Sequence, residues 1–269
     1  MDPVAEEVLG LLGSGRQAEP FSARDPGFDL PRAYRAAAAL RQARMAAGDR
    51  PVGRKIGFTN RTIWDEYGVH APIWGDVLGS TLHDLADLPG EIPAFDLAGL
   101  AEPRIEPEIA FGLAAPPAPG MDDAALLDCI DWIAHGVEIV QSIFPGWRFA
   151  AADTVAAGGL HGALLLGPRI AVAPRRDAWL RELPVFDIAL SCDGTVVDRG
   201  TARNVLEGPL SALRHLAGLL AADPGQPQLA AGEVVTTGTL TRALPVAPGQ
   251  SWRTALSGID LPGLALRFR

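Results

Sequence analysis

The stretch Arg104–Leu113, RIEPEIAFGL, decides the fold prediction because its apolar and charged residues alternate. Successive side chains of an extended strand point to opposite faces, so Glu106 and Glu108 share one face with their Cα atoms about 6.5–7 Å apart. Ile105 and Ile109 then share the other face. The stretch predicts a strand with one apolar face and one face that carries two carboxylates.

The two glutamates need a partner of opposite charge. Like charges this close repel each other, and they repel more strongly where they are poorly hydrated. A hard divalent cation such as Mg²⁺ or Mn²⁺ offsets the repulsion because it binds carboxylate oxygens. The alternative is a solvated strand face paired with arginine. The Glu-x-Glu pattern alone leaves both interpretations open.

A third carboxylate, Glu138, lies in the apolar segment HGVEIVQSIF. An isolated charge is costly to bury in such surroundings. Either Glu138 occupies the wet face of a strand, or it is a third ligand of the same metal ion.

Lys55, in VGRKIGFT, is another charge among apolar neighbours. It is either a surface lysine with a buried stem or a residue near a metal, where it can bind a carboxylate or transfer protons. In VTTGTLTRA, Thr237 and Thr239 with the backbone N–H groups around Gly238 could hold a carboxylate; an ordinary β-turn is the equal alternative. His161, in GGLHGALLLG, has glycine neighbours that leave room beside it, and both a structural and a catalytic histidine fit.

The wider pattern predicts an α+β fold. Apolar spacing and composition predict helices at residues 2–13, 31–48, 122–135 and 207–221 and a strand at 51–58. NRTIWDEYG is predicted to form one or two helical turns that stop at Gly68. After residue 85 short apolar runs alternate with turns, as expected for strands. We therefore predict a mainly helical portion, 1–84, which carries Lys55, and a mixed β domain, 85–269.

Composition narrows the choice of partners and location. The 269 residues carry a formal charge of −9 with pI about 5.0, and no dense Lys/Arg run occurs, which argues against nucleic acid and anionic membranes. Cys129 and Cys192 are too isolated for a disulfide framework or a zinc cluster. The first residues lack a signal-peptide pattern, and no apolar run has membrane-spanning length, so we expect a cytoplasmic protein.

Taken in order, several stretches resemble the fumarylacetoacetate hydrolase superfamily, in particular its 2-keto-4-pentenoate hydratase and 4-oxalocrotonate decarboxylase branch. They are GRKIGFT, RIEPEIAF, GVEIVQS, ADTVA, LEGPLSALRHLAGLL and GEVVTTGTLTRALPVAPGQ. The resemblance covers most of the chain. It implies a helical N-terminal portion packed on the mixed β-roll of that superfamily.

The resemblance also implies a site. Mg²⁺ or Mn²⁺ would be held by Glu106, Glu108 and Glu138, and Lys55 matches the family's active-site lysine. Thr239 of the turn Thr237–Gly238–Thr239 lies where the family contacts the substrate's carboxylate end. His161 stands close to this site, and we take it with Lys55 as a candidate catalytic residue.

The resemblance implies a lyase of aromatic-compound catabolism. A 2-oxo acid would chelate the metal, which stabilises the enolate formed when a neighbouring carbon loses a proton or a carboxyl group. The leading expectation is a hydratase that adds water to a 2-hydroxy-2,4-dienoate. The alternatives are a 2-oxo-3-enedioate decarboxylase, an acylpyruvate-type carbon–carbon hydrolase and a non-catalytic partner subunit.

Departures from the family pattern leave the reaction open. Gln141 replaces an aspartate, and AGGLHG, which contains His161, replaces an Asn/Ser-rich turn. After the lysine strand the chain offers Asp65 and Glu66 but no histidine until His70, which argues against hydrolysis.

A decarboxylase would need an extra cation for its second carboxylate, and Arg61 and Arg148 are candidates. The family also suggests a homo-oligomer and a complex with a pathway-neighbour enzyme.

Overall fold

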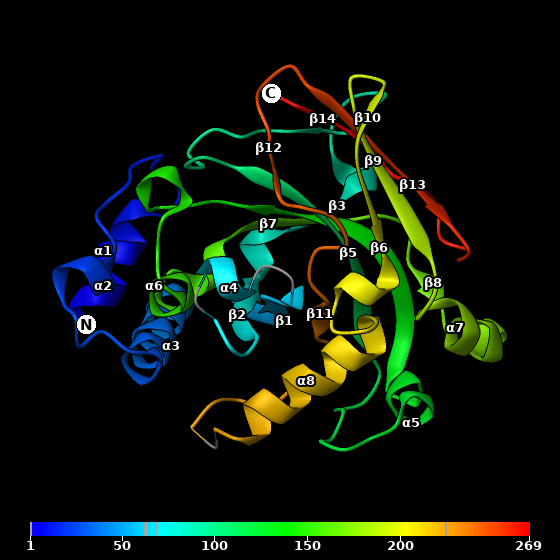
Figure 1. Ribbon diagram of the computed structural model, residues 1–269, viewed down its shortest axis with the longest axis horizontal. Coiled ribbons are helices and arrows are strands. Elements are labelled where there is room, and N and C mark those ends of the chain that lie inside the picture. Colours follow the sequence, from blue (N-terminus) through cyan, green and yellow to red (C-terminus); the bar gives the residue numbers. More distant parts are fainter. Residues whose placement is uncertain (1, 62–63, 68, 224) are drawn as a thin grey trace.

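The structure is a computed structural model that describes residues 2–61, 64–67, 69–223 and 225–269. Its centre is a strongly curled mixed sheet, in which the two long strands β5 (Arg104–Leu113) and β6 (Ile130–Val140) lie side by side (Figure 1). Within the described residues this sheet has nine strands in the order β2-β1-β11-β5-β6-β7-β3, with β12 on β5 and β8 on β6. A second sheet has the order β10-β9-β13-β14-β4. The predicted α+β class is confirmed.

The remaining elements are short. The other strands are β1 (Pro51–Gly57), β2 (Ile73–Leu78), β3 (Leu82–Asp84), β4 (Ala94–Phe95), β7 (His161–Leu166), β8 (Ile170–Ala171), β9 (Asp187–Cys192), β10 (Thr195–Thr201), β11 (Val234–Thr236), β12 (Leu244–Pro245), β13 (Ser251–Ser257) and β14 (Ala265–Phe268). The α-helices are α1 (Pro3–Leu11), α2 (Phe21–Arg24), α3 (Leu30–Ala46), α4 (Trp64–Tyr67), α5 (Asp123–Asp128), α6 (Ala151–Ala156), α7 (Arg176–Glu182) and α8 (Pro209–Ala221).

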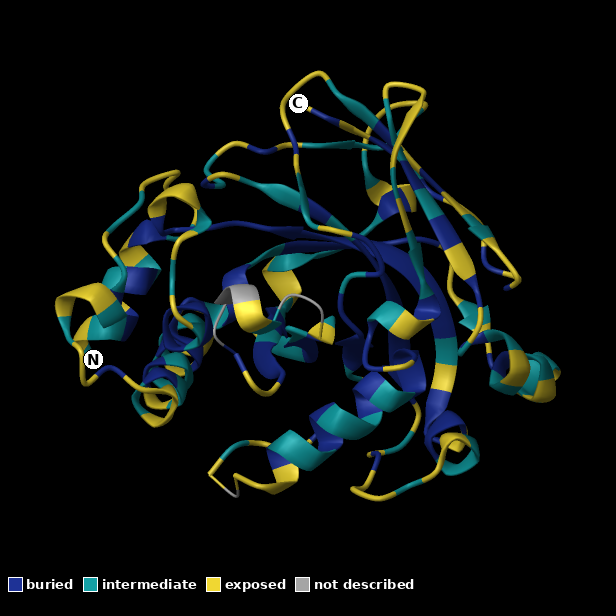
Figure 2. Ribbon diagram, in the orientation of Figure 1, coloured by how far each residue is buried: buried dark blue, intermediate teal, exposed yellow. Residues whose placement is uncertain are grey.

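The alternation in RIEPEIAFGL matches the two faces of β5. Ile109 and Phe111 belong to the core that α8 and α5 complete, and Ile105 belongs to the core shared with the second sheet. All three side chains are fully buried, so this face of β5 is apolar. The long central strands are coloured mostly as buried in Figure 2. Arg104, Glu106 and the other even-numbered residues point to the opposite face. The predicted two-faced strand is therefore confirmed.

The N-terminal helices form a separate layer beside the β1–β2 end of the sheet (Figure 1). Asp29 caps α3 by accepting from the N–H of Arg32, and a proline follows in the first turn. Ala33, Ala36 and Leu40 lie on the buried side of α3 and join a core with α1 and α6. The helices predicted at 2–13 and 31–48 are confirmed to within a few residues.

The helix predicted at 122–135 is wrong beyond its first half. Asp122 caps α5, which ends at Asp128, and the chain enters β6 at Ile130. Residues 130–140 are bracketed by β5 on one side and β7 and β8 on the other, so their backbone groups pair in ladders on both edges. Strand pairing and burial outweigh the local helical pattern here.

The division at residue 84 stays a prediction, and it does not separate two sheets. Strands β1, β2 and β3 from the first portion pair within the same sheet as β5 to β7. The predicted helical turns of NRTIWDEYG correspond to α4, while residues 62–63 and the predicted stop at Gly68 lie outside the described residues.

None of the helices in the described ranges combines the length and the apolar character needed to cross a membrane.

Gly53 sets the close approach of β1 to β11, and its replacement provides a test of this packing. A Cβ on Gly53 would overlap the backbone of Val234, its parallel partner. We predict that Gly53→Ala lowers the free energy of unfolding by about 3 kcal/mol or more. The added methyl group would overlap backbone atoms of Val234, which cannot move aside as a flexible side chain can. Urea denaturation measures this change.

Gly10→Ala is the matched control, because a Cβ on Gly10 in α1 meets no atom within 4 Å. It should leave stability unchanged or raise it by about 0.5–1 kcal/mol. Equal stability of Gly53→Ala and the wild type would contradict the packing described for β1 and β11.

Candidate active site

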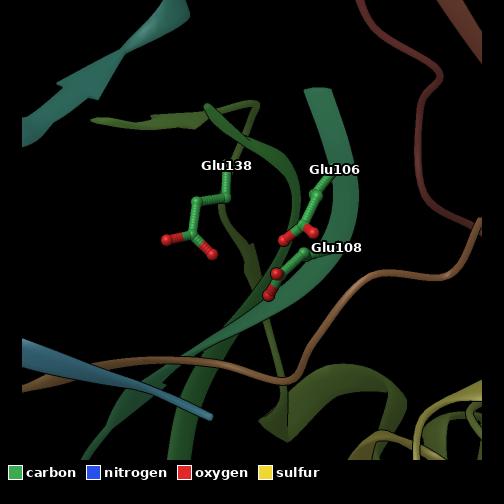
Figure 3. A group of neighbouring side chains, drawn as sticks. All are labelled: Glu106, Glu108 and Glu138. Atoms are coloured by element: carbon green, nitrogen blue, oxygen red, sulfur yellow. The ribbon is translucent and has the colours of Figure 1, made fainter. Parts of the chain in front are cut away.

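Glu106, Glu108 and Glu138 converge on one face of the central sheet (Figure 3). The β5–β6 register sets Glu106 directly opposite Glu138 and Glu108 opposite Gly136. One carboxylate oxygen from each glutamate lies within 4.8 Å of the other two. Glu108 and Glu138 are fully buried, whereas Glu106 is half-buried and lines a pocket.

The hydrogen bonds of Glu108 leave one oxygen free. Its Oε2 accepts from the backbone N–H of Gly238 at 2.8 Å, while its Oε1 is buried without a hydrogen-bond partner among the described residues. A buried carboxylate oxygen without a donor is costly. A hard cation bound between the three glutamates would satisfy it, so the donor set fits a divalent metal.

Burial and neighbouring charges shift the pKa values of the three acidic groups in different directions. Burial raises the pKa of Glu106 to about 7, and burial together with the charge of Glu138 raises the pKa of Glu108 well above its usual range. Burial alone would also raise the pKa of Glu138, but Lys55 and His161 outweigh it and lower the pKa to about 2. Full ionisation of all three groups thus requires more positive charge than Lys55 supplies.

Lys55 reaches this site from β1 through two strand pairings. It lies opposite Thr236 of β11, which in turn lies opposite Ala110 of β5. Its Nζ is 2.9 Å from Oε2 of Glu138, and only 4% of the residue is exposed. Burial would lower the pKa of Lys55, but the three glutamates raise it above its usual value. The structure therefore places the predicted lysine at the carboxylates and on the pocket wall.

The turn Thr237–Gly238–Thr239 follows β11 and borders the same pocket. Gly238 has φ 93°, and a Cβ there would overlap the side chain of Thr59. Thr237 is buried and its hydroxyl donates to the carbonyl of Ile109, so a role in substrate binding stays a prediction. Thr239 and Gly238 line the pocket, with the Thr239 hydroxyl donating to the carbonyl of Thr241.

His161 lies behind Glu138 and borders a different cavity from Lys55. Its Nδ1 is 2.7 Å from Oε1 of Glu138, and its Nε2 is 2.9 Å from the hydroxyl of Thr81. The cavity that His161 lines has a volume of about 210 Å³ and also includes Gln141. The contacts suit a residue that orients Glu138, so a direct catalytic role for His161 stays a prediction.

Gln141 is held by the protein itself. Its side-chain oxygen accepts from the N–H of Ala101, and its backbone N–H donates to Leu160. Gln141 therefore makes buried contacts with two loops of the chain.

The pocket in front of the glutamates has a volume of about 330 Å³. Sequence reasoning missed Arg104 and Trp147, which line it, although Arg104 stands two residues before Glu106 on the same strand face. Neither of the two predicted cations, Arg61 and Arg148, is among the described residues of its wall.

Sequence reasoning also missed His135 of β6, which lies opposite Ile109 of β5. The buried His135 donates through Nδ1 to the carbonyl of Glu108 and contacts the hydroxyl of Thr254 through Nε2. Burial lowers the pKa of His135 to about 4, which keeps it neutral. The two contacts of the His135 ring thus link the strand that carries Glu106 and Glu108 to Thr254 of β13 in the second sheet.

A hydrolase of this superfamily would need acidic and histidine side chains after the lysine strand. Asp65 and His70, which follow that strand, are both exposed. The side chain of Glu66 lies outside what the structure describes.

Known proteins share both the sequence and the fold. The chain is 30% identical over 255 residues to 2-hydroxyhexa-2,4-dienoate hydratase of Comamonas testosteroni, covering 94% of this chain and 92% of the relative. It is 29% identical over 235 residues to 4-oxalocrotonate decarboxylase of Pseudomonas sp. (strain CF600), covering 87% and 84%. A comparison with family models gives no match.

Solved structures agree with these relatives. The chain superposes on 4-oxalocrotonate decarboxylase from Pseudomonas putida G7, complexed with magnesium and adipate, with a TM-score of 0.88 and 26% identity, over 99% of this chain and 96% of the other. A yeast fumarylacetoacetate hydrolase family protein shares the fold at a TM-score of 0.57 and 13% identity over 80% and 91%. The chain belongs to the hydratase and decarboxylase branch of the fumarylacetoacetate hydrolase superfamily.

Proposed function

We propose that this protein is a divalent-metal-dependent hydratase that adds water to a short 2-hydroxy-2,4-dienoate or its 2-oxo-enoate tautomer. The observation that carries the proposal is the convergence of three glutamates within 4.8 Å, with Lys55 against them on the wall of a pocket. Hydratases of such acids are among the chain's relatives.

The glutamates Glu106, Glu108 and Glu138 would hold Mg²⁺ or Mn²⁺. When bound, the ion supplies a Lewis acid that draws electron density from the 2-oxo acid group of the substrate. The free Oε1 of Glu108 and the pocket-facing position of Glu106 support this assignment.

Lys55 is the group that we propose to move the proton. Its ammonium is buried beside Glu138, on the wall of the pocket where a substrate would lie. The substrate gains or loses a proton on carbon during tautomerisation, and a lysine within reach can both give and take it. A bound divalent cation would offset the charge of the glutamates that raise the pKa of Lys55.

The remaining residues bind and orient. Backbone N–H groups at the Gly238 turn and the Thr239 hydroxyl border the pocket and would contact the carboxylate end of the substrate. His161 would fix the orientation of Glu138 from behind, through the same ring that contacts Thr81.

The second candidate reaction is decarboxylation of a 2-oxo-3-enedioate. The decarboxylases among the relatives are similar in identity to the hydratases, and Arg104 adds a cation to the pocket wall. Hydrolysis of a carbon–carbon bond has less support, because His70, the first histidine after the lysine strand, is exposed. A non-catalytic partner role has less support, because the three glutamates converge. A homo-oligomer and a pathway-neighbour partner stay predictions, as does the cytoplasmic location.

Replacement of Glu108 tests the metal site. We predict that Glu108→Gln lowers Mn²⁺ affinity at least about 100-fold, since it removes one charge and one ligand while the fold is kept. His161→Asn should weaken Mn²⁺ about 10–100-fold through the orientation of Glu138. Isothermal titration calorimetry measures both values.

Glu91→Gln is the matched control, because Glu91 is exposed and lies away from the pocket. Wild-type Mn²⁺ affinity in Glu108→Gln, with normal affinity in the control, would overturn the assignment of this ligand.

The stability of the metal-free protein should depend on pH. The pKa of Glu106 and that of Glu108 are raised in the fold, so both groups favour the protonated form and destabilise the fold once pH passes their unfolded values. We predict that the free energy of unfolding falls as pH rises from about 5 to 8, and that excess Mg²⁺ removes this fall. Thermal unfolding at several pH values, with EDTA or Mg²⁺, measures it; a flat profile in EDTA would contradict the burial of these groups.

Turnover distinguishes the two reactions. With Mg²⁺, we predict loss of the dienol absorbance of 2-hydroxypenta-2,4-dienoate and no CO₂ from 2-oxohex-3-enedioate. Lys55→Gln should lower kcat at least about 100-fold, the lower range for a lost acid–base group, and still bind Mn²⁺. Release of CO₂ without hydration would favour the decarboxylase, and no turnover of either acid alongside an active relative would refute both.

A further inference from the structure

We propose that the cavity bordered by His161 is a second binding site, which takes a small organic anion through Arg41. The ligand class is a carboxylate with an apolar body of a few carbon atoms. The site is separate from the proposed catalytic pocket, and binding there does not need the metal ion.

The cavity lies between α3 and β2 and has a volume of about 210 Å³. None of the described residues lines both this cavity and the pocket in front of the glutamates. Gly158 faces the cavity and Gly159 faces the pocket, so this turn forms part of the wall between them. A ligand in the cavity would therefore leave the pocket free for a substrate.

Arg41 is a buried cation whose N–H groups are poorly satisfied. Its side chain is only 8% exposed, and its Nη1 is buried without a hydrogen-bond partner in the part of the chain that the structure describes. Its Nη2 lies 3.5 Å from Oδ1 of Asp76, which is longer than a good hydrogen bond. Arg44, the other arginine on the cavity wall, pairs with Asp49 at 2.9 Å. Arg41 thus has the greater capacity for a new anion.

The carboxylate of Asp76 is also shared. Nη1 of the fully buried Arg54 lies 3.2 Å from the same Oδ1 and 3.5 Å from a carboxylate oxygen of Glu233. Burial lowers the pKa of Arg41, and the attraction of Asp76 offsets only part of this effect. An anion bound at Arg41 would compensate its charge and accept its free N–H bonds.

The rest of the cavity suits a short apolar body. Gln141 adds one polar group, because its side-chain oxygen accepts from Ala101 while its amide nitrogen donates to none of the described residues. Much of the remaining wall is apolar and consists of Leu12, Leu40, Trp74, Leu78 and Leu100. Such a wall with a few polar groups is typical of a site for a small organic molecule.

The experiment compares butyrate with butyramide, which has nearly the same shape without the charge, and with inorganic phosphate, which has no apolar part. Binding to the metal-free full chain in EDTA is measured by calorimetry. We expect butyrate to bind at least about tenfold more tightly than butyramide, as a hydrogen bond to a charged group gives. Butyrate should also bind more tightly than phosphate, because only butyrate buries apolar surface.

Two variants locate the site. Arg41→Gln should lower butyrate affinity to the level of butyramide. Ala38→Leu tests the cavity without changing any charge, because Ala38 is a half-buried residue of α3 on the cavity wall and leucine is a good helix former. It should fill the space and weaken butyrate at least about tenfold, and it decides the matter if Arg41→Gln does not fold.

Two control variants should bind butyrate as the wild type does. Arg35→Gln removes an exposed arginine of the same helix. Arg104→Gln removes a cation from the wall of the other pocket. Circular dichroism establishes that each variant is folded.

Equal affinity for butyrate and butyramide, or phosphate binding as tight as butyrate, would overturn the ligand class. Unchanged butyrate affinity in Ala38→Leu, or its loss in Arg104→Gln, would overturn the location. The proposed metal-dependent function is judged separately, since these measurements contain no metal ion.

Discussion

The structure depends on three carboxylates being held together in a place that water barely reaches. Glu106, Glu108 and Glu138 share one face of adjacent strands, and two of them are fully buried. Mutual repulsion and lost hydration both oppose this arrangement. Nearby positive charge is therefore necessary. Strand β1 supplies Lys55, and the unpaired Oε1 of Glu108 leaves a position where a cation can bind.

The pairing of β5 with β6 fixes that arrangement. A slip of one residue would move one set of carboxylates to the apolar face, where α8 and the second sheet pack. The apolar face resists such a slip because Ile109 and Phe111 would lose their core contacts. The buried His135 of β6 adds a polar constraint, because its ring bridges the Glu108 carbonyl and the hydroxyl of Thr254 in the second sheet. The stability of the core and the geometry of the site thus rest on the same register.

The glutamate pair could be predicted from sequence because strand alternation is a local property. Alternation placed Glu106 and Glu108 on one face, and the apolar surroundings of Glu138 indicated a buried charge. The convergence of Glu138 with that pair depends on a register between strands, which residue spacing does not encode; the resemblance to a known family supplied it. The strand at 130–140 was missed in part because most of it is buried on both faces, and its local pattern is equally typical of a helix. The location of His161 behind Glu138 depends on the pairing of β6 with β7, which is also a register between strands.

The central claim is that the three glutamates hold one divalent ion and present it to the pocket. Anomalous diffraction at the manganese edge, from crystals grown with Mn²⁺ and oxalate, tests this claim most directly. The account predicts one strong peak bonded to an oxygen of each of Glu106, Glu108 and Glu138, with oxalate on its pocket side. A peak elsewhere, or no peak at the glutamates at saturating Mn²⁺, would contradict it.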